Sequence, residues 1–372
     1  MRGSARDVTA SELRNLGPEI CESLQARFPE LSSDVRLKER RLRTYGSHLV
    51  TVVKTDTHPV RRFLLKGPLL DRLSPEMRAE RFATESRLLT EVTPRIQAEN
   101  PRARSPEVLA ADPRRQILVL EFVEGGTLKS RLLGWPSAGG SDTALDLLRL
   151  CGEWLARFHT LTRSGEEGNP FEWIVAKLAG EWTRWVFEHY AGGDTYREIC
   201  RLAEQAGRHH ADFRQPRCWV HGVFGPHHVL VREGQIYVID LESSHPGYPY
   251  EDLGFFSVCP ELFLPWRRAL GARRTDPAEQ GRVLLEAYRE HAPPPTAPEA
   301  VLLRFARLLA LARFLGSSVS GNYLVGPQGR LPPLKARLLV LWWRRQIAAI
   351  SRRELGALSE ASREWRPAPR RA

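Results

Sequence analysis

The sequence of 372 residues is 42% hydrophobic and 27% charged, which is typical of a globular protein and excludes a mainly disordered or collagen-like chain. Its formal net charge is +11, and all but six of its 55 basic residues are arginine. Residues 260–372 contain 20 Lys and Arg against 9 Asp and Glu, so the whole excess lies in the C-terminal third. This segment indicates an anionic partner or, as the competing explanation, the arginine bias of a GC-rich genome.

The cysteines and the apolar runs bear on where the protein works. Its five cysteines are scattered and form no CxxC pair, which gives no sign of a disulfide framework or zinc knuckle and favours the reducing cytoplasm. The longest apolar run, Leu338–Trp343, is too short to span a bilayer, so peripheral contact is the membrane association left open. Nucleic-acid binding is disfavoured because the sequence has no helix-turn-helix, zinc-finger or RNP motif.

The first half of the chain predicts an antiparallel sheet with one helix. Residues 1–34 are expected to form a helical N-terminal extension. Short β-like runs then alternate with turns, at 35–45, 48–55, 61–66, 106–111 and 116–123. Before the fourth run, Ser74-Pro75-Glu76 predicts the start of a helix that reaches about Val92, because Pro is favoured at the first helical position.

After a glycine-marked break at Glu124–Thr127, the pattern becomes mainly helical. Helices are expected at 146–161, 172–189 and 196–209, then, after short apolar runs between Cys218 and Leu241, as far as about Leu358. The prediction is an α+β fold with the two-lobe plan of protein kinases. Its parts are a nucleotide-binding N-lobe at 35–124, a C-lobe with the catalytic loop and acceptor-binding helices at 125–358, and a flexible tail at 359–372.

Lys66 and Glu85 are candidates for a phosphate site. Lys66 ends the apolar strand Phe63–Lys66, and Glu85 lies on the next predicted helix. In phosphoryl transfer, a strand lysine held by a helix glutamate contacts the α- and β-phosphates of ATP. Taken singly, each residue is more typical of a surface charge. Downstream, the backbone of Glu121 and Val123 is placed to bond an adenine edge, although the stretch is equally compatible with a plain connection between strand and loop.

Two acidic residues follow a predicted loop and hairpin at His221–Ile239. Asp240 comes at the end of an apolar strand, where a shielded carboxylate suits Mg²⁺ bound to phosphates, although a turn or cap is its ordinary role. Asp252 stands at a predicted helix start. It is expected either to accept hydrogen bonds from backbone N–H groups of the loop or to cap its own helix.

The order and spacing of these motifs resemble the aminoglycoside phosphotransferase and choline kinase family, over roughly Val35 to Trp343. The motifs are Lys66, Glu85, the connection 121–126, Leu155-Ala156-Arg157-Phe158-His159, His221-Gly222, Ile239-Asp240-Leu241-Glu242, Tyr250-Glu251-Asp252-Leu253 and residues 284–290. The resemblance implies a protein-kinase-like fold and ATP–Mg²⁺-dependent phosphoryl transfer to a hydroxyl of a small molecule. The resemblance implies that Lys66 contacts the phosphates and that Glu85 is the ion-pair partner of this lysine. It also implies that Asp240 binds the metal and that Asp252 supports the catalytic loop.

The catalytic loop departs from the family pattern at two positions. The family has His-Gly-Asp, four residues and then Asn, whereas this chain has Val223 and His228 at the Asp and Asn positions. Valine cannot accept a proton, so the usual base is absent. His228 is a candidate metal ligand, although nitrogen suits Mg²⁺ poorly, and Mn²⁺ stands beside Mg²⁺ as the expected ion. The turn at 46–47 has a single glycine, so no glycine-rich phosphate loop is visible.

Two hypotheses for the activity therefore stay open. One is a phosphotransferase in which His221, His227, His228 or Glu242 replaces the missing base, since positioning and charge stabilisation supply most of the catalysis. The other is a pseudokinase that binds nucleotide or a partner without catalysis.

The resemblance also indicates the kind of acceptor. In that family the acceptor binds between the catalytic loop and the C-terminal helices, and here that segment is basic, which predicts an anionic small molecule or surface. The expected helix at 334–350 has an apolar side and several arginines. It would either lie on an anionic membrane or, as favoured, pack its apolar side on its own domain.

Overall fold

The computed structural model describes residues 18–28, 37–45, 48–55, 62–68, 74–132, 141–263, 277–292, 298–317, 325–326, 329–330 and 333–365. The chain divides into two compact units. Unit 1 comprises Met1–Gly125 and Leu230–Ser243, and unit 2 comprises Gly126–Val229 and Ser244–Ala372. The predicted turn at 46–47 lies outside the described residues.

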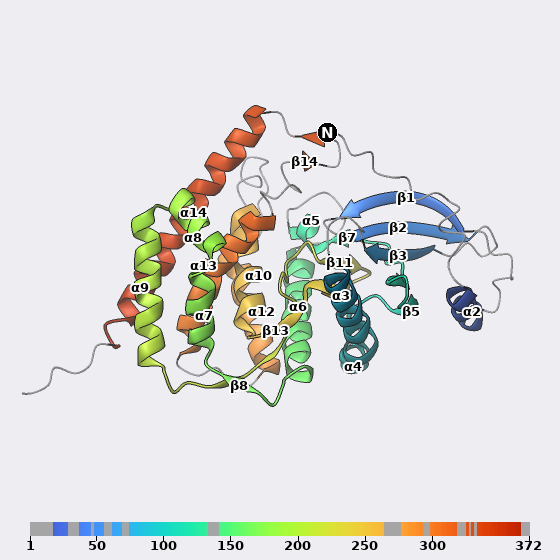
Figure 1. Cartoon of the computed structure of the whole chain (residues 1–372), viewed down its shortest axis with the longest axis horizontal. Helices are drawn as coiled ribbons and strands as arrows, with labels where there is room; N and C mark the ends of the chain where they lie inside the picture. The colour runs from blue at the N-terminus through green and yellow to red at the C-terminus, as the bar shows by residue number, and fades with distance from the viewer. Residues whose placement is uncertain are drawn as a thin grey trace, which may run out of the picture. The chain divides into compact units, whose positions relative to one another are not determined.

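Unit 1 is built on a five-stranded sheet. Its strands are β1 (Leu37–Tyr45), β2 (His48–Thr55), β3 (Arg62–Pro68), β5 (Val108–Asp112) and β6 (Ile117–Glu121). They lie in the order β1-β2-β3-β6-β5 with every neighbouring pair antiparallel, and Figure 1 shows the first three side by side. The predicted antiparallel sheet is confirmed, because each β-like run of the sequence forms one of these strands.

One helical segment crosses unit 1 after β3. The hydroxyl of Ser74 accepts the N–H of Met77, and α3 (Pro75–Arg87) begins at the next residue, as the cap pattern predicts. The chain then passes through a π-helical turn, η1 (Leu88–Val92), into α4 (Thr93–Glu99). The helical segment therefore continues beyond its expected end near Val92. Its last turns bury Ile96 inside the unit, which gives them an apolar contact.

A distant hairpin also belongs to unit 1. Its strands are β11 (Val229–Arg232) and β12 (Gln235–Val238), followed by the 3₁₀ turn η2 (Leu241–Ser243). β12 pairs in parallel with β4 (Ala103–Arg104), and the guanidinium of Arg102 donates to the carbonyl of Gly234. Residues 230–243 fall within the range predicted for the C-lobe, but these pairings attach them to the first unit. The main division, after Gly125, lies next to the predicted lobe boundary.

The N-terminal helix α2 (Pro18–Arg27) packs against β5 within unit 1. Leu24 is buried in an apolar cluster with Phe63 and Val119, and the ring of Phe28 lies 5.7 Å from that of Phe63. This is the part of the predicted N-terminal extension that the structure describes.

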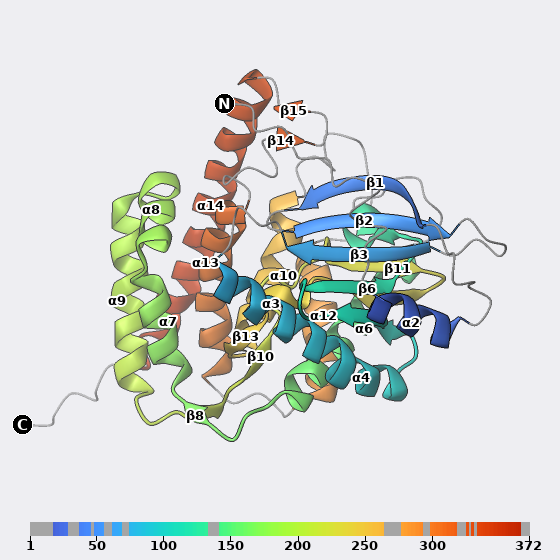
Figure 2. The same cartoon turned by 45° about the vertical axis from the view of Figure 1, so that its right-hand side comes forward.

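Unit 2 is mainly helical. Its helices are α5 (Leu128–Leu132), α6 (Ser141–Leu161), α7 (Pro170–Leu178), α8 (Glu181–Tyr190), α9 (Gly193–His209), α10 (Tyr250–Phe263), α12 (Pro277–His291), α13 (Glu299–Ser317) and α14 (Pro333–Ala361). Short strands join them: β7 (Gly126–Thr127), β8 (Glu167–Gly168), β9 (Gln215–Pro216), β10 (Cys218–Val220), β13 (His245–Gly247), β14 (Val325–Gly326) and β15 (Gly329–Arg330). α6 packs on α12, α10 packs on α13, and α7, α8 and α9 pack together beside α13 (Figure 2). The predicted α+β fold with a mainly helical second part is confirmed.

Two helical predictions for unit 2 were wrong in their limits. The single helix expected at 172–189 is two helices, because the extended backbone of Gly180 (φ −62°, ψ 137°) ends one and begins the other. The polar tail was expected to be flexible from Ser359, but α14 continues to Ala361 and Trp365 is buried in the apolar core. Burial of the Trp365 ring fixes the first part of the tail to the core of unit 2. Residues 366–372 lie outside the described part.

The described part of α14 packs its apolar side inside unit 2. Trp343, Ile347 and Ile350 are buried, and the ring of Trp343 meets Phe314 edge-on at 6.1 Å. These residues are therefore used in the core rather than presented to a membrane, which is the alternative that the sequence favoured. Among the described helices, none combines the length and the apolar character needed to cross a bilayer.

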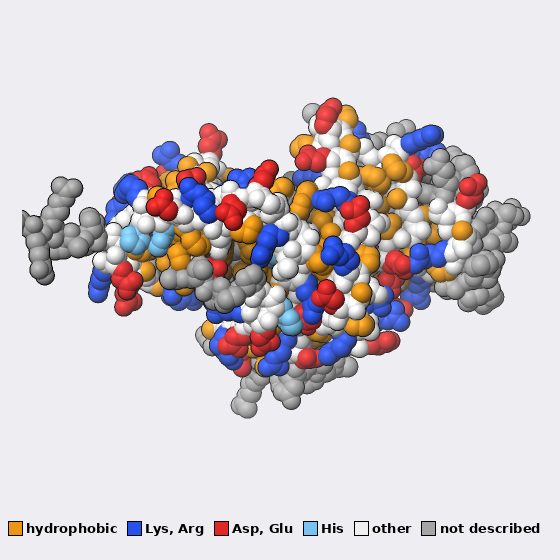
Figure 3. Space-filling view, turned by 90° about the horizontal axis from the view of Figure 1, so that it is seen from below, with side chains coloured by type: hydrophobic (Ala, Val, Ile, Leu, Met, Phe, Trp, Pro, Cys, Tyr) orange, Lys and Arg blue, Asp and Glu red, His pale blue; other side chains and the backbone are white. Residues whose placement is uncertain are grey.

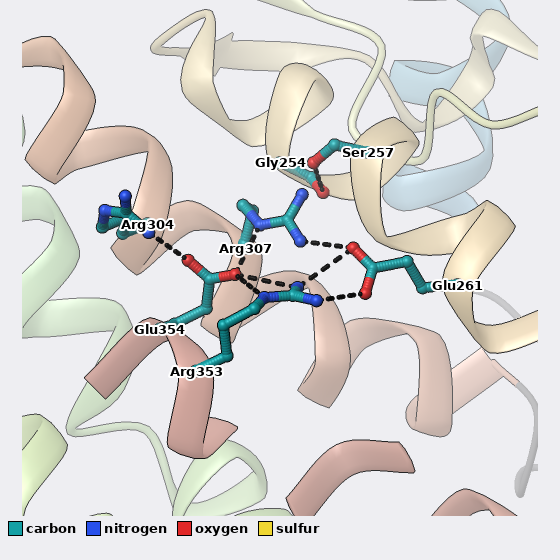
Figure 4. Close-up of polar contacts among 7 residues, drawn as sticks. All are labelled: Gly254, Ser257, Glu261, Arg304, Arg307, Arg353 and Glu354. Atoms are coloured by element: carbon teal, nitrogen blue, oxygen red, sulfur yellow. Dashed lines mark hydrogen bonds and ion pairs between the residues drawn. The ribbon is translucent and has the colours of Figure 1, made fainter. Parts of the chain in front are cut away.

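An ion-pair network ties α14 to α10 and α13 (Figure 4). The buried carboxylate of Glu354 accepts from Arg304 and Arg307 at 3.0 Å and from Arg353 at 3.0 Å. Glu261 pairs with Arg307 and Arg353 as well. Three arginines of the basic C-terminal third are thus engaged by carboxylates, and on the face shown in Figure 3 Lys and Arg alternate with Asp and Glu. With three arginines and two glutamates, the network itself carries a net charge of only +1, so most of the basic excess of the C-terminal third lies outside it.

Candidate functional site

In unit 1, one buried lysine is surrounded by three carboxylates. β3 carries Lys66, whose side chain is 8% exposed. Its Nζ atom lies 2.8 Å from Glu85 Oε2 on α3, 2.8 Å from Asp240 Oδ1 and 2.7 Å from Glu242 Oε2 on η2. The structure brings together Lys66, Glu85 and Asp240, which the sequence singled out separately. Glu242 was considered only as a substitute base, and the sequence held no signal of its contact with the lysine.

The carboxylates keep Lys66 charged. Burial by itself lowers the pKa of Lys66, but the charges of Asp240, Glu85 and Glu242 raise that pKa well above its ordinary value. For Glu85, burial raises the pKa of the carboxyl and Lys66 opposes the rise. Arg81 Nη1 lies 3.7 Å from Glu242 Oε1 and adds a second, more distant cation. Three acids against one close ammonium leave a surplus of negative charge.

This surplus fits a divalent cation. Carboxylate oxygens are the ligands that Mg²⁺ and Mn²⁺ prefer, and Asp240 is the most accessible of the three, with its side chain 37% exposed. Among the described residues, no group of three or more His, Cys, Asp or Glu side chains is already arranged around a metal position. The acids here converge on the Lys66 ammonium instead.

Asp240 has an unusual backbone conformation. Its φ is +73°, in the left-handed region that non-glycine residues rarely adopt, between β12 and the turn η2. Such a conformation costs roughly 1–3 kcal/mol and persists where the surroundings hold it, most often at functional sites. The strain therefore singles out Asp240 independently of its charge.

Glu121 and Val123 lie where β6 ends. The N–H of Glu121 donates to the carbonyl of Glu107 at 2.8 Å, and Val123 is buried just beyond the strand. Their contact with an adenine stays a prediction.

In unit 2, the loop after β10 is anchored to a buried aspartate. The N–H groups of His221 and Gly222 donate to Asp252 Oδ2 and Oδ1 at 2.7 and 2.8 Å. His159 Nε2, on α6, lies 3.1 Å from Asp252 Oδ2, and its Nδ1 lies 3.1 Å from the hydroxyl of Tyr288. Asp252 therefore holds the loop, one of the two roles that its sequence position left open.

The anchor is an ionised carboxylate. Burial by itself raises the pKa of Asp252, but the hydrogen bond and charge of His159, together with His221, bring that pKa below its ordinary value. His159 occurs in a motif of the sequence, but only the tertiary structure places it 3.1 Å from Asp252.

The peptide of Gly222 is held on both of its polar sides. Its φ is +86°, which glycine adopts without strain. Its N–H is bound by Asp252, and its carbonyl accepts Arg313 Nη1 at 2.9 Å. Arg313 also lies 2.6 Å from Glu251 Oε2. No sequence signal pointed to Arg313, which stands on α13, far along the chain from the loop.

The two departures from the family pattern are close to each other in this loop. The Val223 side chain packs against the apolar core of unit 2, and its carbonyl lies 2.9 Å from His228 Nδ1. A carbonyl only accepts, so Nδ1 carries the proton in this contact, and a neutral ring with this tautomer has its lone pair on Nε2. His221 stacks on His228 at 5.5 Å but is itself fully buried. The ring of His227 also contacts His228, with the two ring centroids 4.1 Å apart.

Comparison with known proteins identifies the family. The profile of the phosphotransferase enzyme family matches residues 46–294, and the chain belongs to this family. Among solved structures, a macrolide 2′-phosphotransferase from Brachybacterium faecium is similar, with 18% identity, a TM-score of 0.51, and coverage of 88% of this chain and 96% of that one. No curated protein sequence matches the chain.

A choline/ethanolamine kinase family protein from Mesorhizobium loti is similar as well. It has 16% identity and a TM-score of 0.50, with coverage of 92% of this chain and 99% of that one. At such identities these structures show the shared kinase-like fold. The family and fold predicted from the motifs are confirmed, whereas the roles of individual residues stay predictions.

Proposed function

We propose that the protein transfers a phosphoryl group from ATP to a hydroxyl of a small molecule, with Mg²⁺ or Mn²⁺ as cofactor. The observation that carries the proposal is the buried Lys66 bound at once to Glu85, Asp240 and Glu242. An ammonium held by a helix glutamate is the phosphate-binding device of kinases, and surplus carboxylates beside it suit a divalent ion. Degeneration of a kinase to a merely structural protein would not require these groups to stay together in a buried site.

Each residue has a definite task in this proposal. Lys66 contacts the phosphates, Glu85 orients Lys66, and Asp240 holds the divalent ion. When bound, that ion neutralises charge developing on the transferred phosphoryl group. The backbone of Glu121 and Val123 bonds the adenine edge.

The catalytic loop supplies the acceptor side of the reaction. Val223 takes no proton, so His228, whose Nε2 has the lone pair, accepts the proton of the acceptor hydroxyl. Its second predicted role, as a metal ligand, is an alternative use of the same nitrogen. Asp252 keeps the loop in place through the N–H groups of His221 and Gly222.

The acceptor in this proposal is an anionic small molecule, and the protein works in the cytoplasm. The α14 network accounts for little of the net charge, and other cations of the C-terminal third lie outside it, such as Arg313, which donates to the loop. The cysteines whose side chains are described are free thiols, in keeping with a reducing compartment.

Thermal-shift titration with ATP tests nucleotide binding, with Mg²⁺, with Mn²⁺ and with no metal. Wild type is expected to be stabilised by ATP plus metal, and Lys66→Ala to lose that shift. Arg184→Ala, at an exposed ion pair of α8, is the matched control and should keep it. The absence of any ATP-dependent shift in wild type would refute the proposal.

A pseudokinase is the second candidate, and Val223 is the observation that favours it. ATP consumption with a panel of hydroxyl acceptors separates the two functions. The phosphotransferase proposal expects activity in wild type that falls in His228→Ala. Activity that appears only in Val223→Asp would identify the natural protein as a nucleotide-binding pseudokinase.

A further inference from the structure

A small pocket lies in unit 2 next to the catalytic loop. It measures about 50 Å³ and is lined by Trp173 and Lys177 of α7, Thr183 of α8, Glu251 of α10, and Arg313 with small apolar neighbours on α13. Arg313 connects it to the loop, because the same guanidinium donates to the carbonyl of Gly222, the residue before Val223. A group bound here is therefore held beside the loop that positions the acceptor.

The acidic group of this pocket already has an ion-pair partner. Glu251 is 2% exposed and lies 2.6 Å from Arg313 Nη1, with His245 Nε2 at 3.3 Å from the same carboxylate oxygen. A buried carboxylate with such partners would have to lose an ion pair before it could bind a cationic substrate. The pocket is thus poorly suited to the ammonium groups of choline or aminoglycosides.

The cations of the pocket, in contrast, have donors to spare. Arg313 is 33% exposed, and its contacts within the described part of the chain use Nη1, which leaves the other guanidinium N–H groups for a ligand. Lys177 adds an exposed ammonium from α7. With Glu251 paired, these side chains give the pocket wall a positive excess.

We propose that this pocket binds the negatively charged group, a carboxylate or a phosphate, of the acceptor. The inference depends on the proposed function, because it takes the loop at Gly222 as the place where the acceptor hydroxyl reacts. Arg313 offers the planar fork that suits carboxylate and phosphate oxygens, and Lys177 supplies a point charge.

The size of the pocket sets a further limit on the ligand. Sites for drug-sized molecules measure about 300–1,000 Å³, so a pocket of about 50 Å³ takes one functional group and not a whole antibiotic. The ring of Trp173, fixed edge-on against Tyr248 at 5.9 Å, forms a rigid apolar wall. The acceptor is therefore a small acid or phosphate ester whose apolar or ring portion rests on this wall.

Binding of matched sugars to the full chain tests this inference. Glucuronate and glucose 6-phosphate are the anionic probes, glucose is the neutral one, and choline and kanamycin are the cationic ones. In calorimetric titrations with ATP and metal present, we expect an anionic probe to bind and the neutral and cationic probes to bind at least about tenfold more weakly, as the loss of a charged hydrogen bond predicts. The two anionic arms show whether the pocket takes a carboxylate or a phosphate.

Variants assign the binding to the pocket. Lys177→Ala is expected to weaken binding of the anionic probe about tenfold or more, while the ATP-dependent thermal shift stays unchanged. Arg313→Lys keeps a cation near Gly222 and should still weaken binding of the probe, because the planar guanidinium fork is lost. Arg184→Ala is again the control on a neighbouring helix.

Three outcomes would overturn the inference. They are tighter binding of choline or kanamycin, anion binding that Lys177→Ala leaves unchanged, and an anionic probe that binds but is never phosphorylated while a neutral acceptor is. In each case a retained ATP shift shows that nucleotide binding stands and that the assignment of the pocket has failed.

Discussion

The ammonium of Lys66 pairs with all three carboxylates of the candidate site in unit 1. Replacing Lys66 by methionine is therefore the sharpest perturbation of this site. Methionine keeps most of the apolar stem but leaves the buried Glu85 and Glu242 without the ammonium that lies 2.8 and 2.7 Å from them. Removing one partner of a buried ion pair costs about 3–5 kcal/mol. With an unfolding entropy of about 2.1 cal/mol/K per residue, this loss corresponds to a fall in Tm of about 4–6 °C for the whole chain.

The loss should depend on pH in a defined direction. Burial raises the pKa of Glu85 even with Lys66 present, and removing Lys66 takes away the charge that opposes the rise. A carboxyl whose pKa is higher in the folded state than in the unfolded state holds its proton better when folded. The instability it causes at neutral pH is therefore relieved as the pH falls through the folded pKa. The deficit of Lys66→Met should be larger near about pH 7.5 than near about pH 5.5.

Differential scanning fluorimetry and urea unfolding at both pH values provide the assay. Glu85→Gln alone is the matched control, because Lys66 then keeps Asp240 and Glu242, and it should cost much less than Lys66→Met. The double variant Lys66→Met/Glu85→Gln should recover part of the loss, since one uncompensated carboxylate is gone. A deficit that widens at lower pH, or a double variant less stable than Lys66→Met, would refute the reasoning.

Two further predictions concern the packing of unit 2. In Gly254→Ala the new Cβ would lie 2.7 Å from the backbone of α13, so we expect the free energy of unfolding in urea to fall by about 1–3 kcal/mol. Gly356→Ala is the control: its new Cβ has nothing within 4 Å, and the variant should be stabilised by about 0.5–1 kcal/mol. The reverse order would show that the close approach of α10 to α13 is wrong. Glu354→Ala leaves the arginines of the α14 network without their shared carboxylate and should cost about 3–5 kcal/mol, with faster proteolysis in α14. Glu360→Ala, at an exposed position of the same helix, is its control, and equal stability of the two variants would contradict the role of the network.

Local patterns in the sequence were sufficient for most of the fold. The cap Ser74-Pro75 predicted the start of α3 to the residue, and the β-like runs predicted each strand of the five-stranded sheet. Such features depend on residues a few positions apart, which is the range over which capping and periodicity act. The split at Gly180 was missed because a glycine within a helical pattern is compatible with both one helix and two.

The sequence by itself determined the family and the two-lobe fold, and it singled out Lys66, Glu85, Asp240 and Asp252 as candidate site residues. Only the tertiary structure decided which charges meet: that Glu242 joins Lys66, that Arg313 holds the carbonyl of Gly222, and which C-terminal arginines are engaged by Glu354. The physical reason is that strand and helix formation follow from short-range preferences, whereas an ion pair forms between whichever side chains the packing of distant elements places within hydrogen-bond reach. A net charge of +11 is therefore a property of the sequence, while the part of it that a ligand can meet is a property of the fold.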